Sequence, residues 1–387
     1  MASEIKELSK RVENLYKDYN QFGKAEFVRS GSVVLDALLG GGIPRGTIIA
    51  WSAESGCGKS TGALHISRMY CTYGYKVAYL DYEHGVNESQ LNGERLTQYL
   101  YSNENPNGTF FLFQPQTYKD AEKILDSLMG DIDLFIIDSV TSILPEKMKE
   151  SSSEDVQIGV DARIMSMFLR KYKAEVSRTG CTWILINQMR TKIATGYGQQ
   201  THDAEAGGNA LKFYSDIRLM MKKAFKGTLE RDEEVVGGVK KIPFGAICTI
   251  YAEKNRYERP KIPLNIAIIF GIGISNEYAY YDWLTTDNSI KKSGAWYEIK
   301  VPGTDSARVH GMGKVIEWIN QNKNTVREYI QSKGGYKLLL NSSNPIDISS
   351  SSSEGDAYSE STIEEGVEFD EVVGNGEPKS IEIGEEV

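Results

Sequence analysis

The sequence has few cysteines and histidines and no long hydrophobic run, and these absences exclude several classes of protein. Its 387 residues include four cysteines, spread from position 57 to position 248 without zinc-ligand or disulfide spacing, and four histidines with no close pair. No segment reaches the roughly 18 to 20 consecutive apolar residues of a membrane-spanning helix. We therefore expect reduced thiols, no Cys/His metal framework and a cytoplasmic location.

The chain has no net positive charge either, but the excess of acidic residues is confined to its C-terminal end. The formal net charge is −9, and residues 347–387 carry 13 acidic residues and one basic residue, Lys379. The remaining residues comprise 40 acidic and 43 basic ones. The acidic total therefore does not exclude a nucleic-acid partner.

The chain does contain an alternation of short apolar runs and helical patterns from residue 46 onward. Continuous runs such as 134–138, LFIID, predict strands buried on both faces of a parallel sheet. The last three predicted strands have no helix between them, which favours antiparallel additions. The predicted strands are 47–52, 76–83, 109–115, 134–139, 182–188, 217–223, 245–254 and 265–270.

We predict an α/β protein with four parts. The apolar spacing over 4–19 predicts an amphipathic helix, which lies either on its own core or on a neighbouring copy. The Ser-rich and acidic C-terminal composition, with few apolar residues, predicts disorder. The predicted parts are an N-terminal helix and strand arm (1–35), an α/β core (36–270), a small α+β C-terminal domain (271–341) and a disordered acidic tail (342–387).

Residues 53–60, AESGCGKS, nearly match the phosphate-binding pattern G-x-x-x-x-G-K-[ST]. A predicted strand precedes this stretch and a helical pattern follows, which is the arrangement that holds phosphates at a helix N-terminus. Ala53 replaces the first glycine, so we predict a negative φ at that position. Lys59 would contact the outer phosphates and Ser60 would bind Mg²⁺. The nucleotide-contacting residues predicted here are Ala53, Glu54, Ser55, Gly56, Cys57, Gly58, Lys59, Ser60 and Thr61.

Three further polar residues lie at the ends of apolar strands, where a nucleotide site would need them. Asp138 ends LFIID, as a carboxylate next to Mg²⁺ does in phosphate-loop proteins. Glu83 ends another predicted strand and could activate the attacking water, while Gln188 ends a third and could sense the γ-phosphate. Each alone is also typical of a cap or turn. Together with the loop they favour a site for ATP and Mg²⁺, in which Ser60 and Asp138 are the metal-binding residues.

Several motifs make the resemblance to a known family specific. GGNALKFY at 207–214 matches a hallmark of bacterial RecA recombinases without a gap, and LINQMR, DYEHG, FIIDSVTSILP and SGAWYEIK are similar to other segments of that family. The similarity extends over residues 15–330. It implies a RecA-type ATPase and DNA-binding core that forms helical filaments on single-stranded DNA and exchanges strands with a homologous duplex.

The resemblance also implies roles for individual residues. Lys59, Ser60 and Asp138 would bind MgATP, Glu83 would position water, and Gln188 would couple nucleotide to DNA. Lys254 and Arg256 stand where the family has two lysines that reach the ATP of the adjacent subunit. Gln90 stands where a tyrosine commonly stacks on adenine, and Phe270 aligns with another aromatic residue near the base. These positions include the expected catalytic residues Glu83, Lys59, Gln188, Lys254 and Arg256.

The expected DNA contacts come from the same resemblance. Two segments, 146–157 and 189–206, are expected to be mobile loops near the sensor. Apolar wedges between bases and donors to phosphates bind any sequence. The expected DNA-binding residues are Ile158, Arg163, Ser166, Arg170, Arg190, Ile193, Gly207, Gly208 and Asn209.

Two alternative functions remain open from the sequence. One is a ring-forming motor of helicase type, and the other is a filament that mainly stimulates cleavage of a repressor, as in the SOS response. The acidic tail either aids solubility or competes with DNA, as the tail of RecA proteins does. Single-strand-binding protein and loading mediators are expected as further partners by the same resemblance.

Overall fold

The computed structural model describes residues 25–101, 108–140, 154–192, 202–205, 210–235, 238–258 and 263–333. The helix expected at 4–19 and the tail expected at 342–387 lie outside this part of the chain. Within the described residues, no helix is both long enough and apolar enough to span a membrane.

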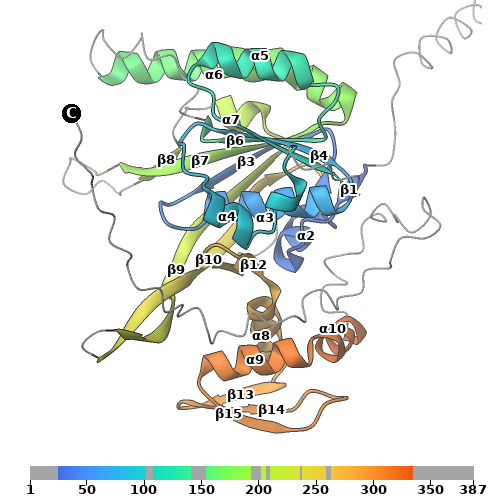
Figure 1. Ribbon diagram of the computed structural model, residues 1–387, viewed down its shortest axis with the longest axis vertical. Helices are drawn as coiled ribbons and strands as arrows, with labels where there is room; N and C mark the ends of the chain where they lie inside the picture. The colour runs from blue at the N-terminus through green and yellow to red at the C-terminus, as the bar shows by residue number, and fades with distance from the viewer. Residues whose placement is uncertain are drawn as a thin grey trace, which may run out of the picture. The chain divides into compact units, whose positions relative to one another are not determined.

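The described residues form one large mixed sheet that is parallel at its centre (Figure 1). The strand order is β12-β11-β10-β9-β3-β7-β6-β4-β5, and β8 pairs with β7. The segment from β9 to β5 is parallel throughout, whereas β10, β11, β12 and β8 pair antiparallel. The strands are β3 (Ile48–Ala53), β4 (Lys76–Asp81), β5 (Thr109–Phe113), β6 (Leu134–Asp138), β7 (Thr182–Lys192), β8 (His202–Glu205), β9 (Ile217–Val235), β10 (Gly238–Asn255), β11 (Leu264–Ile269) and β12 (Gly273–Ser275).

Helices cover both faces of this sheet, which explains why its central strands carry apolar residues on both faces. Alternate β3 residues enter different cores: Ile49 and Trp51 pack with α3, whereas Ile48 and Ala50 pack with α5 and α6. Figure 1 shows α3 and α4 on one face and α5 and α6 on the other. The helices of this region are α2 (Val33–Leu39), α3 (Lys59–Thr72), α4 (Glu88–Gly93), η1 (Thr97–Tyr99), α5 (Tyr118–Leu128), α6 (Glu154–Thr179) and α7 (Ala210–Tyr214). The predicted α/β class with a mostly parallel sheet is confirmed.

Three local predictions were incomplete. β9 is antiparallel to β10 as expected but parallel to β3, and both strands of the β9–β10 hairpin run beyond the predicted 217–223 and 245–254. Their outer parts contain many charged residues and show no regular apolar alternation, so periodicity does not reveal them. Parts of the two expected loops are regular: 154–157 begin α6, and 189–192 continue β7 and pair with β8.

The residues after β12 have their own apolar core. It is formed by helices packed on a three-stranded antiparallel sheet, with Leu284, Ile299 and Ile319 fully buried. Asn276 links this region to the start of α2, because its amide accepts from Val33 N at 3.0 Å and donates to the Gly31 carbonyl at 2.9 Å. The elements are α8 (Asn276–Thr286), β13 (Ile290–Ser293), β14 (Trp296–Ile299), β15 (Ala307–His310), α9 (Met312–Gln321) and α10 (Lys323–Ser332), and a small sheet pairs β1 (Phe27–Val28) with β2 (Ile43–Pro44). The domain boundaries at 35, 270 and 341 stay predictions.

Candidate nucleotide-binding site

The phosphate loop lies between strand β3 and helix α3. β3 ends at Ala53, and α3 begins at Lys59 with Gly58 as its N-cap in a left-handed conformation (φ 76°). Ala53 keeps the extended backbone of the strand, and the described non-glycine residues with positive φ lie elsewhere. The first glycine of the pattern is therefore dispensable here, because no left-handed conformation is needed at that position.

Close packing explains two of the glycines that follow. A Cβ on Gly58 would lie 2.7 Å from Cγ2 of Ile268 in β11, and a Cβ on Gly62 would lie 2.7 Å from Cη2 of Trp51 in β3. Side chains at these positions would push α3 away from the sheet. Glycine thus keeps the helix N-terminus, with its unpaired N–H groups, against the end of β3.

Lys59 is enclosed by the loop. It is 9% exposed, and its Nζ donates hydrogen bonds to the Glu54 carbonyl at 3.1 Å and the Ala53 carbonyl at 3.5 Å. An ammonium group has three donors on a flexible stem, so it can exchange these carbonyls for phosphate oxygens. The lysine expected to bind the outer phosphates is therefore held at the centre of the loop.

The other loop residues have mixed environments. The Glu54 carboxylate accepts from Lys223 N at 3.3 Å, which joins the loop to β9. Cys57 is buried, and the Cys248 thiol lies against its carbonyl oxygen at 3.6 Å. Ser55 and Gly56 are exposed and Thr61 is half-buried. The loop backbone between these anchors faces solvent, where it can meet a ligand.

Ser60 and Asp138 meet at the end of β6. Ser60 Oγ donates to Asp138 Oδ2 at 2.6 Å, and the Tyr79 hydroxyl donates to the same oxygen at 2.7 Å. Burial raises the pKa of Asp138, which is 3% exposed, and the two hydroxyl donors offset part of this increase. A cation would favour the ionised carboxylate.

Hydroxyl and carboxylate oxygens are ligands that Mg²⁺ accepts together with water and phosphate. The Ser60 and Asp138 pair fits an ion completed by a nucleotide. Within the described residues there is no group of three or more His, Cys, Asp or Glu that could hold a metal without such help.

Four parallel strands bring the predicted polar residues to one edge of the sheet. Ala53 is the register partner of Gln188 on β7, and Asp81 is the partner of Asp138. Gln188 Nε2 donates to Glu83 Oε1 at 2.9 Å, and both side chains are exposed. The expected sensor amide and the expected water-positioning carboxylate are thus in direct contact beside the loop.

Asp81 fixes the turn that carries Glu83. Its Oδ1 accepts from Gly85 N at 3.2 Å and its Oδ2 accepts from Val86 N at 3.0 Å. His84, within this turn, has a φ of 51°. The buried carboxylate therefore holds the turn in a conformation that a non-glycine residue seldom adopts.

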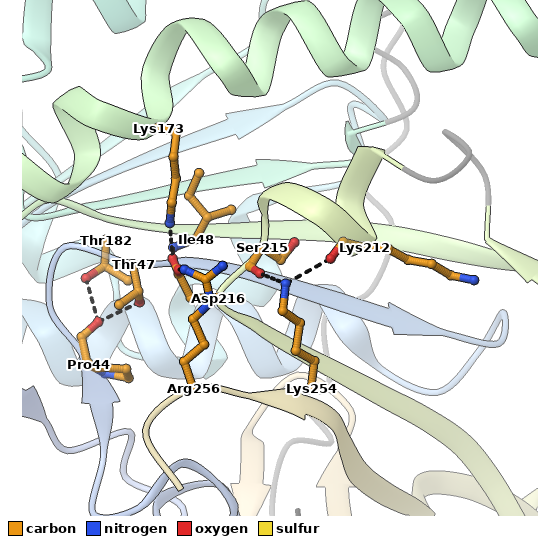
Figure 2. A network of polar contacts seen from close by, with 10 residues as sticks. All are labelled: Pro44, Thr47, Ile48, Lys173, Thr182, Lys212, Ser215, Asp216, Lys254 and Arg256. Atoms are coloured by element: carbon orange, nitrogen blue, oxygen red, sulfur yellow. Dashed lines mark hydrogen bonds and ion pairs between the residues drawn. The ribbon is translucent and has the colours of Figure 1, made fainter.

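Lys254 and Arg256 lie together at the C-terminal end of β10 (Figure 2). Lys254 Nζ donates to the carbonyl oxygens of Lys212 at 2.9 Å and Ser215 at 2.6 Å. Arg256 Nη1 donates to Asp216 Oδ1 at 3.0 Å. Burial, and then the charge of Arg256, lower the pKa of Lys254.

This pair lies at the edge of the sheet opposite the phosphate loop. Asn255 is the register partner of Ile217 at the start of β9, and Asp216 N donates to the Ile48 carbonyl at the start of β3 at 2.8 Å. The loop begins at Ala53, at the other end of that six-residue strand. At about 3.3 Å per residue, the strand separates the two edges by about 17 Å. The described structure does not bring these cations to the loop of the same subunit.

The region expected to face the base is formed by α4 and the turn after β11. Phe270 is 45% exposed. Gln90 forms a capping box with Asn87, in which its Oε1 accepts from Asn87 N at 3.1 Å. A Cβ on Gly93 would lie 1.6 Å from the Gly271 carbonyl oxygen, so α4 contacts this turn directly. The Gln90 side chain thus caps the N-terminus of α4, and Phe270 is the exposed aromatic residue of this region.

Three of the expected DNA contacts form one face of α6. Arg163 and Arg170 are exposed and Ser166 is half-buried, at helical spacing, while the opposite face buries Met165 and Phe168. Ile158 belongs to α6 and Arg190 belongs to β7. Ile193, Gly207, Gly208 and Asn209 lie outside the described residues.

The sequence patterns did not assign a role to three further residues: Tyr79, Asp81 and Asp216. Tyr79 reads as one more apolar residue of a strand, and its hydroxyl partner comes from another strand. Asp81 ends its strand as Asp138 does, so the same sequence pattern could have indicated it. Asp216 has partners from separate elements, which no local pattern reveals.

A glycine-rich loop between a parallel strand and a helix, with an aspartate ending another parallel strand of the same sheet, defines a phosphate-loop protein. A family model described as RecA N-terminal domain matches residues 11–275. The chain belongs to the RecA family.

Curated relatives support this assignment. "Protein RecA" of Bordetella avium (strain 197N) is 33% identical over 309 residues, which are 79% of this chain and 77% of that protein. "Protein RecA" of Bordetella pertussis (strain Tohama I) is 32% identical over 349 residues, covering 85% of this chain and 87% of that protein. A solved structure described as "Crystal structure of the RadB recombinase" aligns with a TM-score of 0.45 at 22% identity, covering 64% of this chain and 98% of that one.

Proposed function

We propose that this protein is an ATP-dependent recombinase that assembles as a helical filament on single-stranded DNA and exchanges strands with a homologous duplex. The observation that carries the proposal is the placement of Lys254 and Arg256 at the sheet edge opposite their own loop. A cationic pair that cannot reach its own nucleotide is suited to the nucleotide of a neighbour. A repeated contact of that head-to-tail kind builds a helix when it does not close.

Within one subunit, we propose that the loop N–H groups and Lys59 bind the phosphates of ATP. Ser60 and Asp138 would hold Mg²⁺, which when bound neutralises charge on the phosphates. Glu83 would orient the attacking water, and its contact with Gln188 would report the γ-phosphate to the segment after β7. The hydrogen bond between these two side chains supports their action as one unit.

Between subunits, Lys254 and Arg256 would complete the site by contacting the phosphates of the adjacent subunit. Interaction energy between copies then depends on the γ-phosphate, so hydrolysis weakens the filament and its hold on DNA. The exposed residues Arg163, Ser166 and Arg170 on α6 would bind the DNA backbone, which gives strong salt dependence and little base preference.

The shared site can be tested by mixing two variants that are each severely slowed. Lys59→Ala subunits keep the cations but lack the loop lysine, and Arg256→Gln subunits have the reverse defect. Each alone should hydrolyse ATP on single-stranded DNA only at a low residual rate. In an equal mixture, roughly a quarter of the head-to-tail junctions pair an intact loop with an intact cation, so hydrolysis should reappear. Sedimentation of labelled subunits with the DNA verifies that both variants assemble together.

Absence of any recovery in co-assembled filaments would contradict the shared site, because a site within one subunit cannot be restored by mixing. Strand exchange is measured separately, with labelled single-stranded DNA and either a homologous or an unrelated duplex. Product formation only with ATP and homology supports the recombinase. Unwinding of either duplex would instead indicate a motor of helicase type.

A further inference from the structure

Asp216 is a buried carboxylate at the edge of the sheet opposite the phosphate loop. It is 3% exposed and directly precedes β9. Its Oδ2 accepts from Ile48 N at 2.9 Å and pairs with the Lys173 ammonium of α6, while its Oδ1 accepts from Arg256 Nη1 (Figure 2). Donors from β3, from α6 and from the end of β10 therefore hold one carboxylate in place.

The cluster of Asp216, Lys173 and Arg256 contains one negative and two positive charges. Lys173 and Asp216 offset each other, so the cluster keeps the positive charge of Arg256. The Arg256 side chain is 56% exposed, against 5% for Asp216. A guanidinium has five N–H donors in one plane, and a bond from one nitrogen to a buried carboxylate fixes the direction in which the others point.

The backbone around Asp216 is also fixed. The hydroxyls of Thr47 and Thr182 both donate to the Pro44 carbonyl, at 2.7 and 3.2 Å, just before Ile48 (Figure 2). The carbonyls of Lys212 and Ser215 hold the neighbouring Lys254. The two cations thus project from a rigid part of the sheet rather than from a loose strand end.

We propose that Asp216, with Lys173 as its counter-ion, is the positioning residue that directs Arg256 toward the ATP of the adjacent subunit. This inference rests on the proposed function, since it assigns a residue to the shared site. Asp216 contacts neither nucleotide nor DNA in this account, and it acts through Arg256 alone.

Lys173 also links this cluster to the helix face expected to contact DNA. Arg163, Ser166, Arg170 and Lys173 follow each other at spacings of three, four and three residues, which forms one stripe on α6. The last member of the stripe is the counter-ion of Asp216. A shift of α6 on binding DNA would therefore be transmitted through Lys173 and Asp216 to Arg256.

The test compares Asp216→Asn with Arg256→Gln and with the double variant, in the full chain on single-stranded DNA. Asparagine keeps the shape of the side chain but removes the charge that orients Arg256. We expect the kcat of ATP hydrolysis to fall by about 10- to 100-fold, as displaced catalytic groups commonly cause. Binding of a fluorescent ATP analogue by single subunits should not change, because the loop is at the other edge. The double variant should be no slower than Arg256→Gln.

A matched control is Asp133→Asn. Asp133 accepts from Arg45 Nη2 at 3.0 Å and from Lys76 N at 3.0 Å, so it makes the same types of bond with partners other than those of Asp216. Should Asp216→Asn fail to fold, the variant that also carries Lys173→Met removes both charges of the pair. The same loss of kcat is expected from it.

Two results would overturn the inference. One is an Asp216→Asn rate no lower than that of Asp133→Asn, and the other is a further loss when Asp216→Asn is added to Arg256→Gln. Either one leaves the proposed function intact if Arg256→Gln is itself slow. A full rate in Arg256→Gln would overturn both the shared site and the role of Asp216.

Discussion

The hydroxyl of Tyr79 gives a direct test of the proposed magnesium site. It donates to Asp138 Oδ2 at 2.7 Å, and the Ser60 hydroxyl donates to the same oxygen at 2.6 Å. Tyr79→Phe removes one of two donors from a buried carboxylate, and a hydrogen bond to a charged group contributes about 1.5–3 kcal/mol. Because groups that orient a metal ligand typically affect affinity by about 10- to 100-fold, we expect a loss of that size in the Mg²⁺ midpoint for ATP binding.

The effect should also depend on pH. Burial already raises the pKa of Asp138, and the Tyr79 hydroxyl counteracts that rise. Without the hydroxyl the pKa rises further, so protons compete better with Mg²⁺ and the loss of affinity grows as the pH falls. The assay is a Mg²⁺ titration of fluorescent ATP-analogue binding at several pH values, together with thermal unfolding.

Tyr172→Phe is the control for this experiment. The Tyr172 hydroxyl donates to Asp126 Oδ1, also at 2.7 Å, but between α6 and α5, away from the loop. It should cost stability without moving the Mg²⁺ midpoint. If Tyr79→Phe destabilises the fold as Tyr172→Phe does and leaves the Mg²⁺ midpoint unchanged, the hydroxyl is structural and our reasoning about Asp138 is wrong.

Three further predictions concern stability and DNA binding. Burial raises the pKa of Glu94 to about 8, so stability present below its ordinary pKa of 4.5 is lost as the pH rises toward 8; Glu94→Gln should flatten the decline in melting temperature between about pH 5 and 8, and parallel declines would contradict this. Gly56 and Gly58 both have positive φ, but only at Gly58 would a Cβ meet Ile268, so Gly58→Ala should destabilise more than Gly56→Ala in denaturant unfolding. Arg170→Gln should weaken binding to all single-stranded sequences alike and lower the salt slope by roughly one, whereas a change in sequence preference would argue against a phosphate contact.

The contacts that could be predicted from the sequence are those at the carboxyl ends of the parallel strands. The carboxyl ends of these strands meet at one edge of the sheet, so the apolar run ending in Asp138 and the loop ending in Ser60 were expected to meet. Ser60 Oγ and Asp138 Oδ2 lie 2.6 Å apart. The contact of Gln188 with Glu83 follows from the same rule, although the sequence assigned the two residues separate roles.

The unpredicted part depends on register and on charged pairing. Asp216 lies at the start of a strand and meets Lys173 only because α6 crosses that position. The outer β9–β10 hairpin pairs charged residues through its backbone, so it has no apolar period to detect. In each case the deciding contact joins residues whose own segments look unremarkable.

Helical reconstruction of the protein on single-stranded DNA with a non-hydrolysable ATP analogue tests the central claim most directly. Our account predicts an open helix in which each nucleotide lies between Lys59 of one subunit and Lys254 and Arg256 of the next. Closed rings, or nucleotides bound far from those two cations, would contradict it.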